Sequence, residues 1–214
     1  MYLTGYPNFY VEKPLLAIYN QDNLQKLQTS REWYGELKLK VRRGLITIDY
    51  KNEIKFYKYL TDIPVKHLEL PISRIHNMDL PPKTILDAGL YIDSVDQLPR
   101  FFIFDILLYR ANELLTNCLQ RRKLLETLIK TDDTIWRPHY TDFWLQEFRQ
   151  MLEGDSFLIK KSALNFGIPY ERFIHEVEGL VIKNKKSRLK YPKKQTIFSH
   201  SFFKLKIDMY KNKI

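Results

Sequence analysis

The stretch "GELKLKVRRG", residues 35–44, alternates apolar and charged side chains. On a β-strand, side chains two residues apart point to the same face. The apolar members therefore face one side and the charged members the other: Leu37, Leu39 and Val41 against Glu36, Lys38, Lys40 and Arg42. This pattern predicts either a solvated surface strand or the floor of a pocket in which one lysine is a nucleophile.

The positive charge of the chain is concentrated near its C-terminus. The 214 residues are 44% hydrophobic, enough for a substantial core, and carry a net charge of +10. Residues 183–214 hold 11 Lys and Arg against one acidic residue, Asp208, and the remaining 24 basic and 24 acidic residues cancel. Such a segment suits a polyanion such as nucleic acid, and the alternative is a solubilising tail.

Several classes of protein are excluded by composition. A single cysteine, Cys118, excludes an intramolecular disulfide and a cysteine-rich metal site, and the five histidines lack metal-ligand spacing. No apolar run reaches the roughly 18 residues that span a bilayer, and no signal-peptide pattern is present. We therefore expect an intracellular protein with no membrane partner, including a viral protein inside a host cell.

The pattern of strands and helices predicts an α+β fold with largely antiparallel sheets, because no regular βαβ alternation is present. We expect helices at 20–30, 108–130 and 139–153, and strands at 35–41, 45–50, 54–59, 84–92, 101–107, 179–183 and 202–207. Gly44 is the expected turn residue between the first two strands.

Two segments near the end of the chain combine acids and bases. In "EGLVIK", Glu178 and Lys183 bracket a short apolar strand, and in "KLK" Lys204 and Lys206 share one strand face. Cations that neutralise phosphate charge and a carboxylate that holds Mg²⁺ are the usual parts of a phosphate-binding cleft. The alternative for Glu178 and Lys183 is a strand with solvated charges at its ends.

Seven motifs, in chain order, resemble those of the covalent nucleotidyltransferases, and within them the small viral or bacterial ATP-dependent DNA ligases. The motifs are KPLLA (13–17), ELKLKVRR (36–43), LDAGLY (86–91), FFIFDIL (101–107), RRKLLETL (121–128), EGLVIK (178–183) and KLK (204–206). The 26 residues from Glu178 to Lys204 are also typical of that family, and SRLKYP (187–192) resembles its tyrosine-containing loop.

The resemblance implies one nucleotidyltransferase (ATP-grasp-like) domain over residues 1–214, with two mostly antiparallel sheets flanked by helices. The basic segment 183–214 would line the cleft. The chain ends eight residues after Lys206, so we expect no C-terminal OB-fold domain. An OB-fold or other protein partner could then act in trans.

The resemblance also implies a reaction that uses ATP and Mg²⁺. A lysine attacks the α-phosphate of ATP, forms lysine–AMP and releases pyrophosphate. The AMP passes to the 5′-phosphate of a nicked strand, in nicked duplex DNA, and the adjacent 3′-hydroxyl displaces it to seal the nick. A lysine can attack only without its extra proton, because the ammonium form has no lone pair.

Each matched residue is implied to have a role. Lys38 is the nucleophile, Glu36 accepts a hydrogen bond from the adenine amino group, Arg43 reaches the ribose or a nucleic-acid phosphate, Phe104 stacks on adenine, Glu178 supports Mg²⁺, and Lys183, Lys204 and Lys206 contact phosphates. Asp87 of LDAGLY is a further candidate. Without the resemblance, Phe104 would be interpreted as a core residue.

The sequence departs from the family at three positions of the site. Lys40-Val41 replaces the Asp-Gly that follows the nucleophile, and Gly89 replaces the glutamate expected after "LDA". We expect the turn to shift toward Arg43-Gly44, which would leave Lys40 on the strand face of Lys38. Lys40 could then favour the uncharged amine or bind a phosphate, whereas the lost carboxylates weaken the positioning of the nucleotide, which can cost about 10²-fold in rate.

Three alternatives remain open at this point. Lys40 could be the nucleophile, with Gly44 as the glycine of a lysine–glycine motif like that of RNA ligases. The chain could be a ligase-derived pseudoenzyme that holds nucleic acid or a protein partner without catalysis. It could also be an mRNA-capping guanylyltransferase, which shares the motif set and uses GTP.

Overall fold

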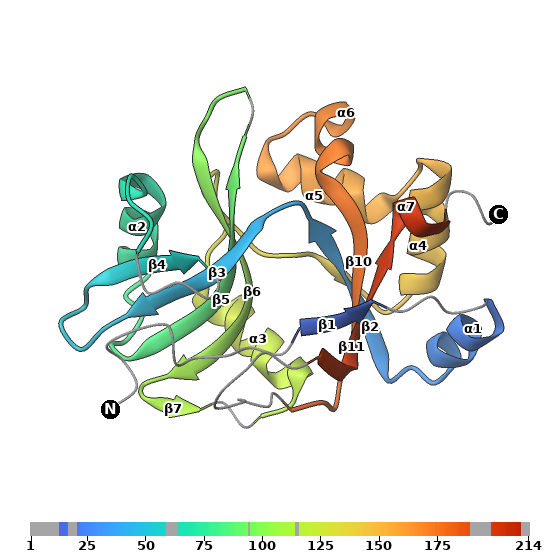
Figure 1. Cartoon of the computed structure of the whole chain (residues 1–214), viewed down its shortest axis with the longest axis horizontal. Helices are drawn as coiled ribbons and strands as arrows, with labels where there is room; N and C mark the ends of the chain where they lie inside the picture. Colours follow the sequence, from blue (N-terminus) through green and yellow to red (C-terminus); the bar gives the residue numbers. More distant parts are fainter. Residues whose placement is uncertain are drawn as a thin grey trace. The chain divides into compact units, whose positions relative to one another are not determined.

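The structure is a computed structural model and describes residues 13–16, 21–58, 64–93, 95–113, 116–188 and 198–210. These residues divide into two compact units, each built on its own sheet (Figure 1). The first unit contains the described residues of Val41–Arg137, together with Arg188. The second contains the described residues of Glu12–Lys40, Pro138–Ser187 and Thr196–Ile214.

A five-stranded sheet forms the centre of the second unit, with the strand order β1-β11-β10-β2-β9. Its strands are β1 (Lys13–Leu16), β2 (Trp33–Leu39), β9 (Tyr140–Thr141), β10 (Val177–Asn184) and β11 (Phe198–Lys206). The β1–β11 pair is parallel and the other pairs are antiparallel. The helical segments of this unit are α1 (Gln21–Thr29), α4 (Trp144–Glu153), α5 (Phe157–Phe166), α6 (Tyr170–Phe173), the 3₁₀ turn η2 (Ile174–Glu176) and α7 (Ile207–Tyr210).

The two faces of this sheet differ in chemistry. One face is apolar and is formed by side chains that pair across the strands: Leu37, Leu180, Ile182, Phe203 and Leu205. It packs against α4, where the Trp144 and Phe203 rings meet edge to face with centroids 6.1 Å apart. A side chain at Gly35 would place its Cβ 2.6 Å from the Trp144 Cβ, so a glycine allows this close approach. The opposite face of the sheet is left for charged residues.

The first unit is built on a second sheet, with the strand order β4-β3-β5-β6-β7 and β8 beside β6. Its strands are β3 (Arg42–Ile48), β4 (Ile54–Lys58), β5 (Thr84–Ile92), β6 (Pro99–Tyr109), β7 (Asn112–Glu113) and β8 (Ile135–Trp136). All of these pairs are antiparallel except β6–β8. The helices of this unit are α2 (Glu69–His76) and α3 (Cys118–Leu128).

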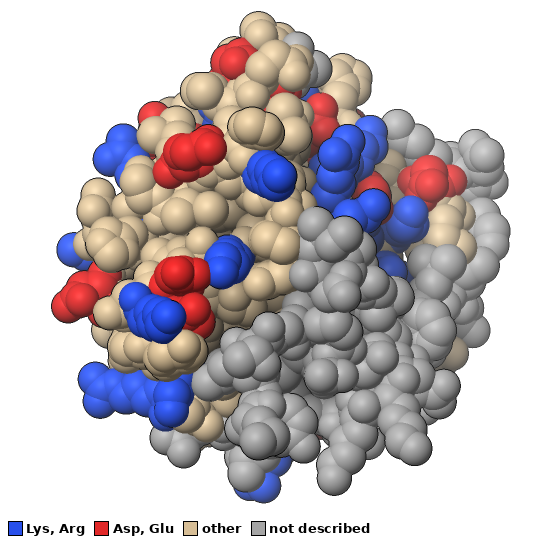
Figure 2. Space-filling model, turned by 60° about the vertical axis from the view of Figure 1, so that its left-hand side comes forward, with Lys and Arg blue, Asp and Glu red and all other residues tan. Residues whose placement is uncertain are grey.

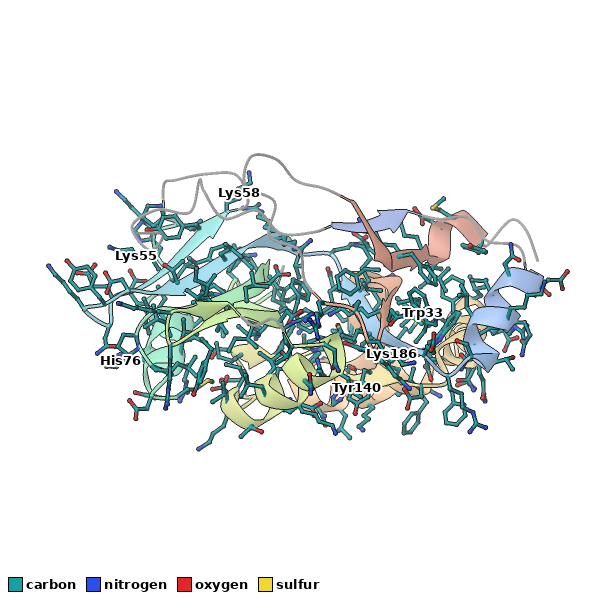
Figure 3. The ribbon with its side chains drawn as sticks, turned by 90° about the horizontal axis from the view of Figure 1, so that it is seen from below. Trp33, Lys55, Lys58, His76, Tyr140 and Lys186 are labelled. Carbon is teal, nitrogen blue, oxygen red and sulfur yellow. The ribbon has the colours of Figure 1, made fainter. Side chains whose placement is uncertain are left out.

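Both helices of the first unit lie on the same side of its sheet (Figure 3). Ile75 of α2 and Leu125 of α3 belong to one buried cluster with strand residues such as Ile46, Leu86 and Ile103. In Figure 3, the labelled Lys58 of β4 and His76 of α2 lie on opposite sides of this unit. Because the helices bury one face, the other face remains for the predicted nucleotide-binding residues.

The α+β class and the two mostly antiparallel sheets are confirmed, but the predicted turn at Gly44 is wrong. β2 ends at Leu39 and pairs with β9 and β10, whereas β3 pairs with β4 and β5. The chain therefore passes from one sheet to the other at Lys40-Val41 without forming a hairpin. Gly44 lies inside β3, where a Cβ would come within 2.1 Å of the Tyr57 carbonyl oxygen. A glycine at this position allows the backbones of β3 and β4 to approach each other closely.

The predicted helix at 108–130 is too long at its N-terminal end. β6 continues to Tyr109, and Arg110 and Ala111 take left-handed conformations, with φ of 52° and 67°, that turn the chain into β7. Helix α3 then begins at Cys118, behind a capping box in which Asn117 and Gln120 exchange side-chain and backbone hydrogen bonds. The leucine spacing correctly predicted a helix here, but the position at which the helix begins is determined by the Asn117 cap.

The predicted helix at 139–153 also begins later. Tyr140–Thr141 forms the short edge strand β9 beside β2, and α4 starts at Trp144. Helices α2 and α5 were not predicted at all.

Some predictions fall outside the described residues. These are Ala17 of KPLLA, residues 189–192 of SRLKYP, and residues 189–197 and 211–214 of the basic segment. The prediction that 183–214 lines a cleft therefore stays a prediction. Within the part of the chain that the structure describes, no helix is both long enough and apolar enough to cross a membrane.

Candidate active site

One face of the five-stranded sheet brings together most of the predicted catalytic and phosphate-binding residues. Lys38 of β2 lies opposite Gly179 of β10, which lies opposite Lys206 of β11. Glu36 and Lys204 form the next row on the same face, two residues along their strands. The face opposite the apolar core thus holds a carboxylate and three lysines from two strands.

A β-bulge adds Glu178 to this face. Simple alternation from Leu180 would place Glu178 on the apolar face. The register of β10 against β2 shifts between Val177 and Gly179, so that Glu178 is an extra residue without a direct partner. Bulges of this kind redirect side chains, and Glu178 forms an ion pair with Lys38 on the charged face.

Gly179 makes this bulge possible. Its φ of 140° lies in the region that side-chain-bearing residues rarely adopt, and a Cβ there would lie 2.0 Å from the carbonyl oxygen of Leu205. The glycine of "EGLVIK" therefore has a structural purpose, which is to let the carboxylate before it reach the lysines.

Glu178 is held between two ammonium groups. Its Oε2 contacts Nζ of Lys38 directly and lies 3.5 Å from Nζ of Lys206. Burial acts to raise the pKa of Glu178, but the hydrogen bond from Lys38 and the charges of Lys38 and Lys206 outweigh it, so that the pKa lies below its ordinary value. Glu178 is therefore a carboxylate at neutral pH.

Glu36 is paired with Lys183 instead of with the nucleophile. Lys183 Nζ lies 2.6 Å from Glu36 Oε2, and only 2% of Glu36 and 9% of Lys183 is exposed. The pair spans β2 and β10 on the charged face. Two predicted nucleotide-binding residues therefore neutralise each other, and a nucleotide that used either one would have to take the place of this contact.

Lys40 does not share the environment of Lys38. It follows the end of β2, so the expectation that both lysines lie on one strand face is wrong. The Lys40 backbone amide donates to the carbonyl of Glu176 at 2.9 Å, and its ammonium donates to the carbonyl of His175 at 2.6 Å. Lys40 therefore fastens the end of β2 to η2, the turn that leads into the bulge.

The face of the first unit's sheet that is turned away from α2 and α3 carries Arg43 and Asp87. The Arg43 guanidinium binds the carboxylate in a two-pronged contact, with Nε 2.9 Å from Oδ1 and Nη2 2.6 Å from Oδ2. Such paired hydrogen bonds fix the guanidinium plane. Asp87 is therefore the residue that orients Arg43.

Two of the departures from the family pattern, Val41 and Gly89, meet on this same face. A Cβ built on Gly89 would lie 2.3 Å from Cγ2 of Val41 and 3.2 Å from Cζ of Phe104. The Val41 side chain thus fills the space beside Gly89 that a longer side chain would need. Phe104 is partly exposed here and packs edge to face on Phe102, at 5.2 Å between centroids.

One supporting pair was missed by the sequence interpretation. Asp105 follows Phe104, points to the helical side of the sheet, and binds Arg121 of α3 with both oxygens at 3.0 Å. Arg121 is fully buried and also donates to the Thr116 carbonyl. The sequence held a signal, since neighbouring strand residues face opposite sides and the Asp of "FD" needs a cation on the helix side. This pair fixes the strand that carries Phe104.

Among its described residues, the charged face of the second unit carries more cations than carboxylates. Lys38, Lys183, Lys204 and Lys206 stand against Glu36 and Glu178. An excess of positive charge on a partly buried surface favours a polyanion such as a triphosphate. No group of three or more His, Cys, Asp or Glu that could hold a metal ion is present among the described residues.

No family model matches the sequence, and a search of curated proteins finds no significant match. Solved structures do match. The ligase domain of LigD from M. tuberculosis matches 94% of this chain at 21% identity with a TM-score of 0.55. The bacteriophage T7 ATP-dependent DNA ligase, in complex with ATP, matches 94% of the chain at 14% identity with a TM-score of 0.54.

The chain has the fold of a ligase adenylyltransferase domain. A mycobacterial DNA ligase D complexed with ATP and MES gives a similar match, at 20% identity and a TM-score of 0.53. The chain spans 61% of the length of both mycobacterial structures and 68% of the T7 ligase. At these identities the likeness establishes the fold, and the activity has to be argued from the chain's own residues.

Proposed function

We propose that this ligase-like domain is an ATP-dependent adenylyltransferase that forms a covalent lysine–AMP at Lys38. The observation that supports it best is the cluster of Lys38, Glu178 and Lys206, assembled across three strands by a bulge that only a glycine permits. A structural ion pair would not need such a bulge. A nucleophile with a carboxylate and a second cation beside it suits attack on a phosphate.

The proposed step forms a bond between Lys38 Nζ and the α-phosphorus of ATP and breaks the bond to the β-phosphate oxygen, so that pyrophosphate leaves with its electron pair. From its ammonium form, Lys38 gives up one proton before attack and a second as the N–P bond forms, and both protons pass to solvent. Lys38 Nζ is bound to the Glu178 carboxylate, so this contact must open before the amine can reach the α-phosphorus. Lys183, Lys204 and Lys206 would balance the charge of the phosphates.

Glu178 is the residue that would hold Mg²⁺. This ion binds proteins through one or two carboxylates together with water and substrate phosphates. Glu36 is already bound to Lys183, so Glu178 is the carboxylate that could contact the ion. A single carboxylate ligand suits a Mg²⁺ ion that is also bound by the phosphates of the nucleotide. When bound, Mg²⁺ supplies positive charge to the phosphates, as in other phosphoryl-transfer enzymes.

In the first unit, Arg43, held by Asp87, would contact the ribose or a nucleic-acid phosphate, and Phe104 would stack on adenine. Glu36 would accept a hydrogen bond from the adenine amino group after Lys183 turns to a phosphate. These roles follow the ligase resemblance, and the fixed Arg43 guanidinium and the partly exposed Phe104 ring support them.

We further propose that the AMP is transferred to the 5′-phosphate of nicked duplex DNA and that the protein seals the nick, with an OB-fold or other protein acting in trans. Such an enzyme would work inside cells in DNA repair or replication. The fold shared with DNA ligases supports this step.

A second candidate, a pseudoenzyme that binds nucleic acid or a protein partner, is favoured by Val41 and Gly89, which together remove the space for a carboxylate. An RNA ligase or a GTP-dependent capping enzyme with Lys40 as nucleophile is less well supported. The Lys40 ammonium is bound to a backbone carbonyl on η2, without a carboxylate contact among its described partners.

The test is intact-mass measurement after incubation with ATP or GTP and Mg²⁺. We expect an AMP adduct in the wild type and in Lys40→Ala, and no adduct in Lys38→Ala. An adduct that is lost only in Lys40→Ala would contradict the assignment, and a GMP adduct would favour a capping enzyme. Folded protein without any adduct, with and without an added OB-fold domain, would favour the pseudoenzyme.

A further inference from the structure

Gly89 adjoins two residues that contact the nucleotide in the proposed function. In β5, Gly89 is the direct partner of Arg43 in β3 (Figure 1). A Cβ built on Gly89 would also lie 3.2 Å from Cζ of Phe104, which belongs to β6, the neighbour of β5 on its other side. A nucleotide whose base stacks on Phe104 and whose sugar reaches Arg43 therefore has its sugar over Gly89.

The surface that this sugar would meet is apolar. The same Cβ would lie 2.3 Å from Cγ2 and 2.8 Å from Cβ of Val41, and the Val41 side chain is partly exposed. The three heavy atoms nearest to that point are thus all carbons, two from Val41 and one from Phe104. A methyl group neither donates nor accepts a hydrogen bond, so Val41 offers the sugar hydroxyls no partner.

The carboxylates of the proposed site have partners other than the sugar. Asp87 lies two residues before Gly89 on β5, and its two oxygens bind the Arg43 guanidinium at 2.9 and 2.6 Å. Only 4% of Asp87 is exposed. In the proposed function, Glu36 accepts a hydrogen bond from the adenine amino group and Glu178 holds Mg²⁺. A sugar hydroxyl would therefore compete for each of these carboxylates with a group that is already bound there.

We propose that the nucleotide site does not select for the sugar hydroxyls, so that the protein uses 2′-deoxyadenosine triphosphate as readily as ATP. This inference rests on the proposed function, through the contacts of Phe104 and Arg43 with the nucleotide. The reaction has the same balance with either substrate. Lys38 Nζ bonds to the α-phosphorus, pyrophosphate leaves with its electron pair, two protons pass from the ammonium to solvent, and the product is lysine–dAMP in place of lysine–AMP.

The expected discrimination follows from the chemistry of this surface. A site whose polar groups bind a substrate hydroxyl rejects the analogue without that hydroxyl by about 10⁴–10⁵-fold, because those groups are then left unpaired. Removing a hydroxyl that lies on a methyl group leaves no protein group unpaired. We therefore expect ATP and its deoxy analogues to differ by less than about 10-fold as substrates.

The first experiment measures the rate of lysine–nucleotide formation by intact mass at several concentrations of ATP, 2′-deoxyATP and 2′,3′-dideoxyATP, each with Mg²⁺. We expect the second-order rate constants of the three nucleotides to lie within about 10-fold of one another. A preference for ATP above that limit would overturn the inference.

The second experiment measures the dissociation constants of the same nucleotides by calorimetric titration without Mg²⁺, which does not depend on adduct formation. We expect these constants to lie within the same limit. Tighter binding of ATP beyond it, or binding of none of the nucleotides, would overturn the inference. Equal binding without any adduct would support the inference and contradict the proposed adenylyl transfer, so the two failures are distinguishable.

A pair of double variants tests the part played by Val41. Val41→Gly with Gly89→Glu replaces the valine by a carboxylate, and we expect its preference for ATP over 2′-deoxyATP to rise by at least about 10-fold, because the deoxynucleotide leaves that carboxylate unpaired. The matched control is Val41→Gly with Gly89→Met, whose side chain has a similar length and no oxygen, and its preference should equal that of the wild type. Equal preferences in the two double variants would contradict the role of Val41.

Discussion

Val41 occupies space that a side chain at position 89, such as the glutamate that the ligase resemblance implies there, would need. A Cβ on residue 89 would lie 2.3 Å from a methyl carbon of Val41. The Phe104 ring, 3.2 Å from the same point, leaves no other direction for this side chain to avoid the valine. The two departures from the ligase pattern are therefore one change in packing. This explains how the sheet stays well packed although a carboxylate is missing.

This coupling predicts the stability of variants at the two positions. Gly89→Glu alone should lower the free energy of unfolding by about 1–3 kcal/mol, because the new side chain collides with Val41. Adding Val41→Gly should recover part of that loss, with a coupling energy of about 0.5–3 kcal/mol in a double-mutant cycle measured by urea unfolding. Val95→Gly, at an exposed position of the same unit, is the control and should add independently. Additivity in the Val41 cycle would contradict the shared space.

Glu178 predicts a pH dependence. Since its pKa in the folded protein is below the ordinary value of about 4.5, its ion pairs stabilise the fold above that pH and are lost as the pH falls through the lowered pKa. The difference in free energy of unfolding between the wild type and Glu178→Gln should therefore be larger at pH 7 than at pH 3. The measurement is urea unfolding at both pH values. A difference that does not change with pH would mean that the carboxylate is not paired in solution.

At the scale of the element, β10 departs from simple alternation at one position, and the candidate site depends on that departure. Alternation read from the sequence assigned Leu180 and Ile182 to the core correctly, and the register confirms it. Alternation alone places Glu178 on the same face as Leu180 and Ile182. The hydrophobic pattern does not indicate that β10 contains an extra, unpaired residue at this point. What the sequence did contain was Gly179, and a glycine inside a strand is a signal of a bulge.

The bulge can be tested with Gly179→Ala. The new methyl group would collide with the Leu205 carbonyl and the residue would be held at an unfavourable φ, so we expect a loss of stability of more than 1 kcal/mol and little lysine adduct. Gly154→Ala is the matched control, because that glycine also has a positive φ, of 81°, but has no atom near its Cβ. The control should lose only about 1 kcal/mol and keep the adduct. Equal effects of both changes on the adduct would refute the role of the bulge.

At the scale of the whole molecule, the order of motifs along the chain was sufficient to predict the fold class and the ligase likeness. It could not give the partners of the charged residues, because Glu36–Lys183, Arg43–Asp87 and Asp105–Arg121 join positions that are far apart in sequence. Nor could it give the crossing between sheets after Leu39, since a strand followed by a second strand resembles a hairpin in sequence.

The distribution of charge agrees with the composition. On the face shown in Figure 2, basic and acidic side chains lie side by side over much of the described surface. This fits the balance of 24 basic and 24 acidic residues before residue 183. Among the described residues, a local excess of lysines over carboxylates is found instead on the charged sheet face.

The shared space of Val41 and Gly89 also constrains how such a chain can evolve. A descendant that gained a glutamate at position 89 first would pass through an overpacked and destabilised intermediate, whereas one that first lost the valine would pass through a looser intermediate that can still fold. The order of the two mutations therefore matters. This dependence is epistasis, and it opposes the gain of a carboxylate at position 89 even where selection would favour one.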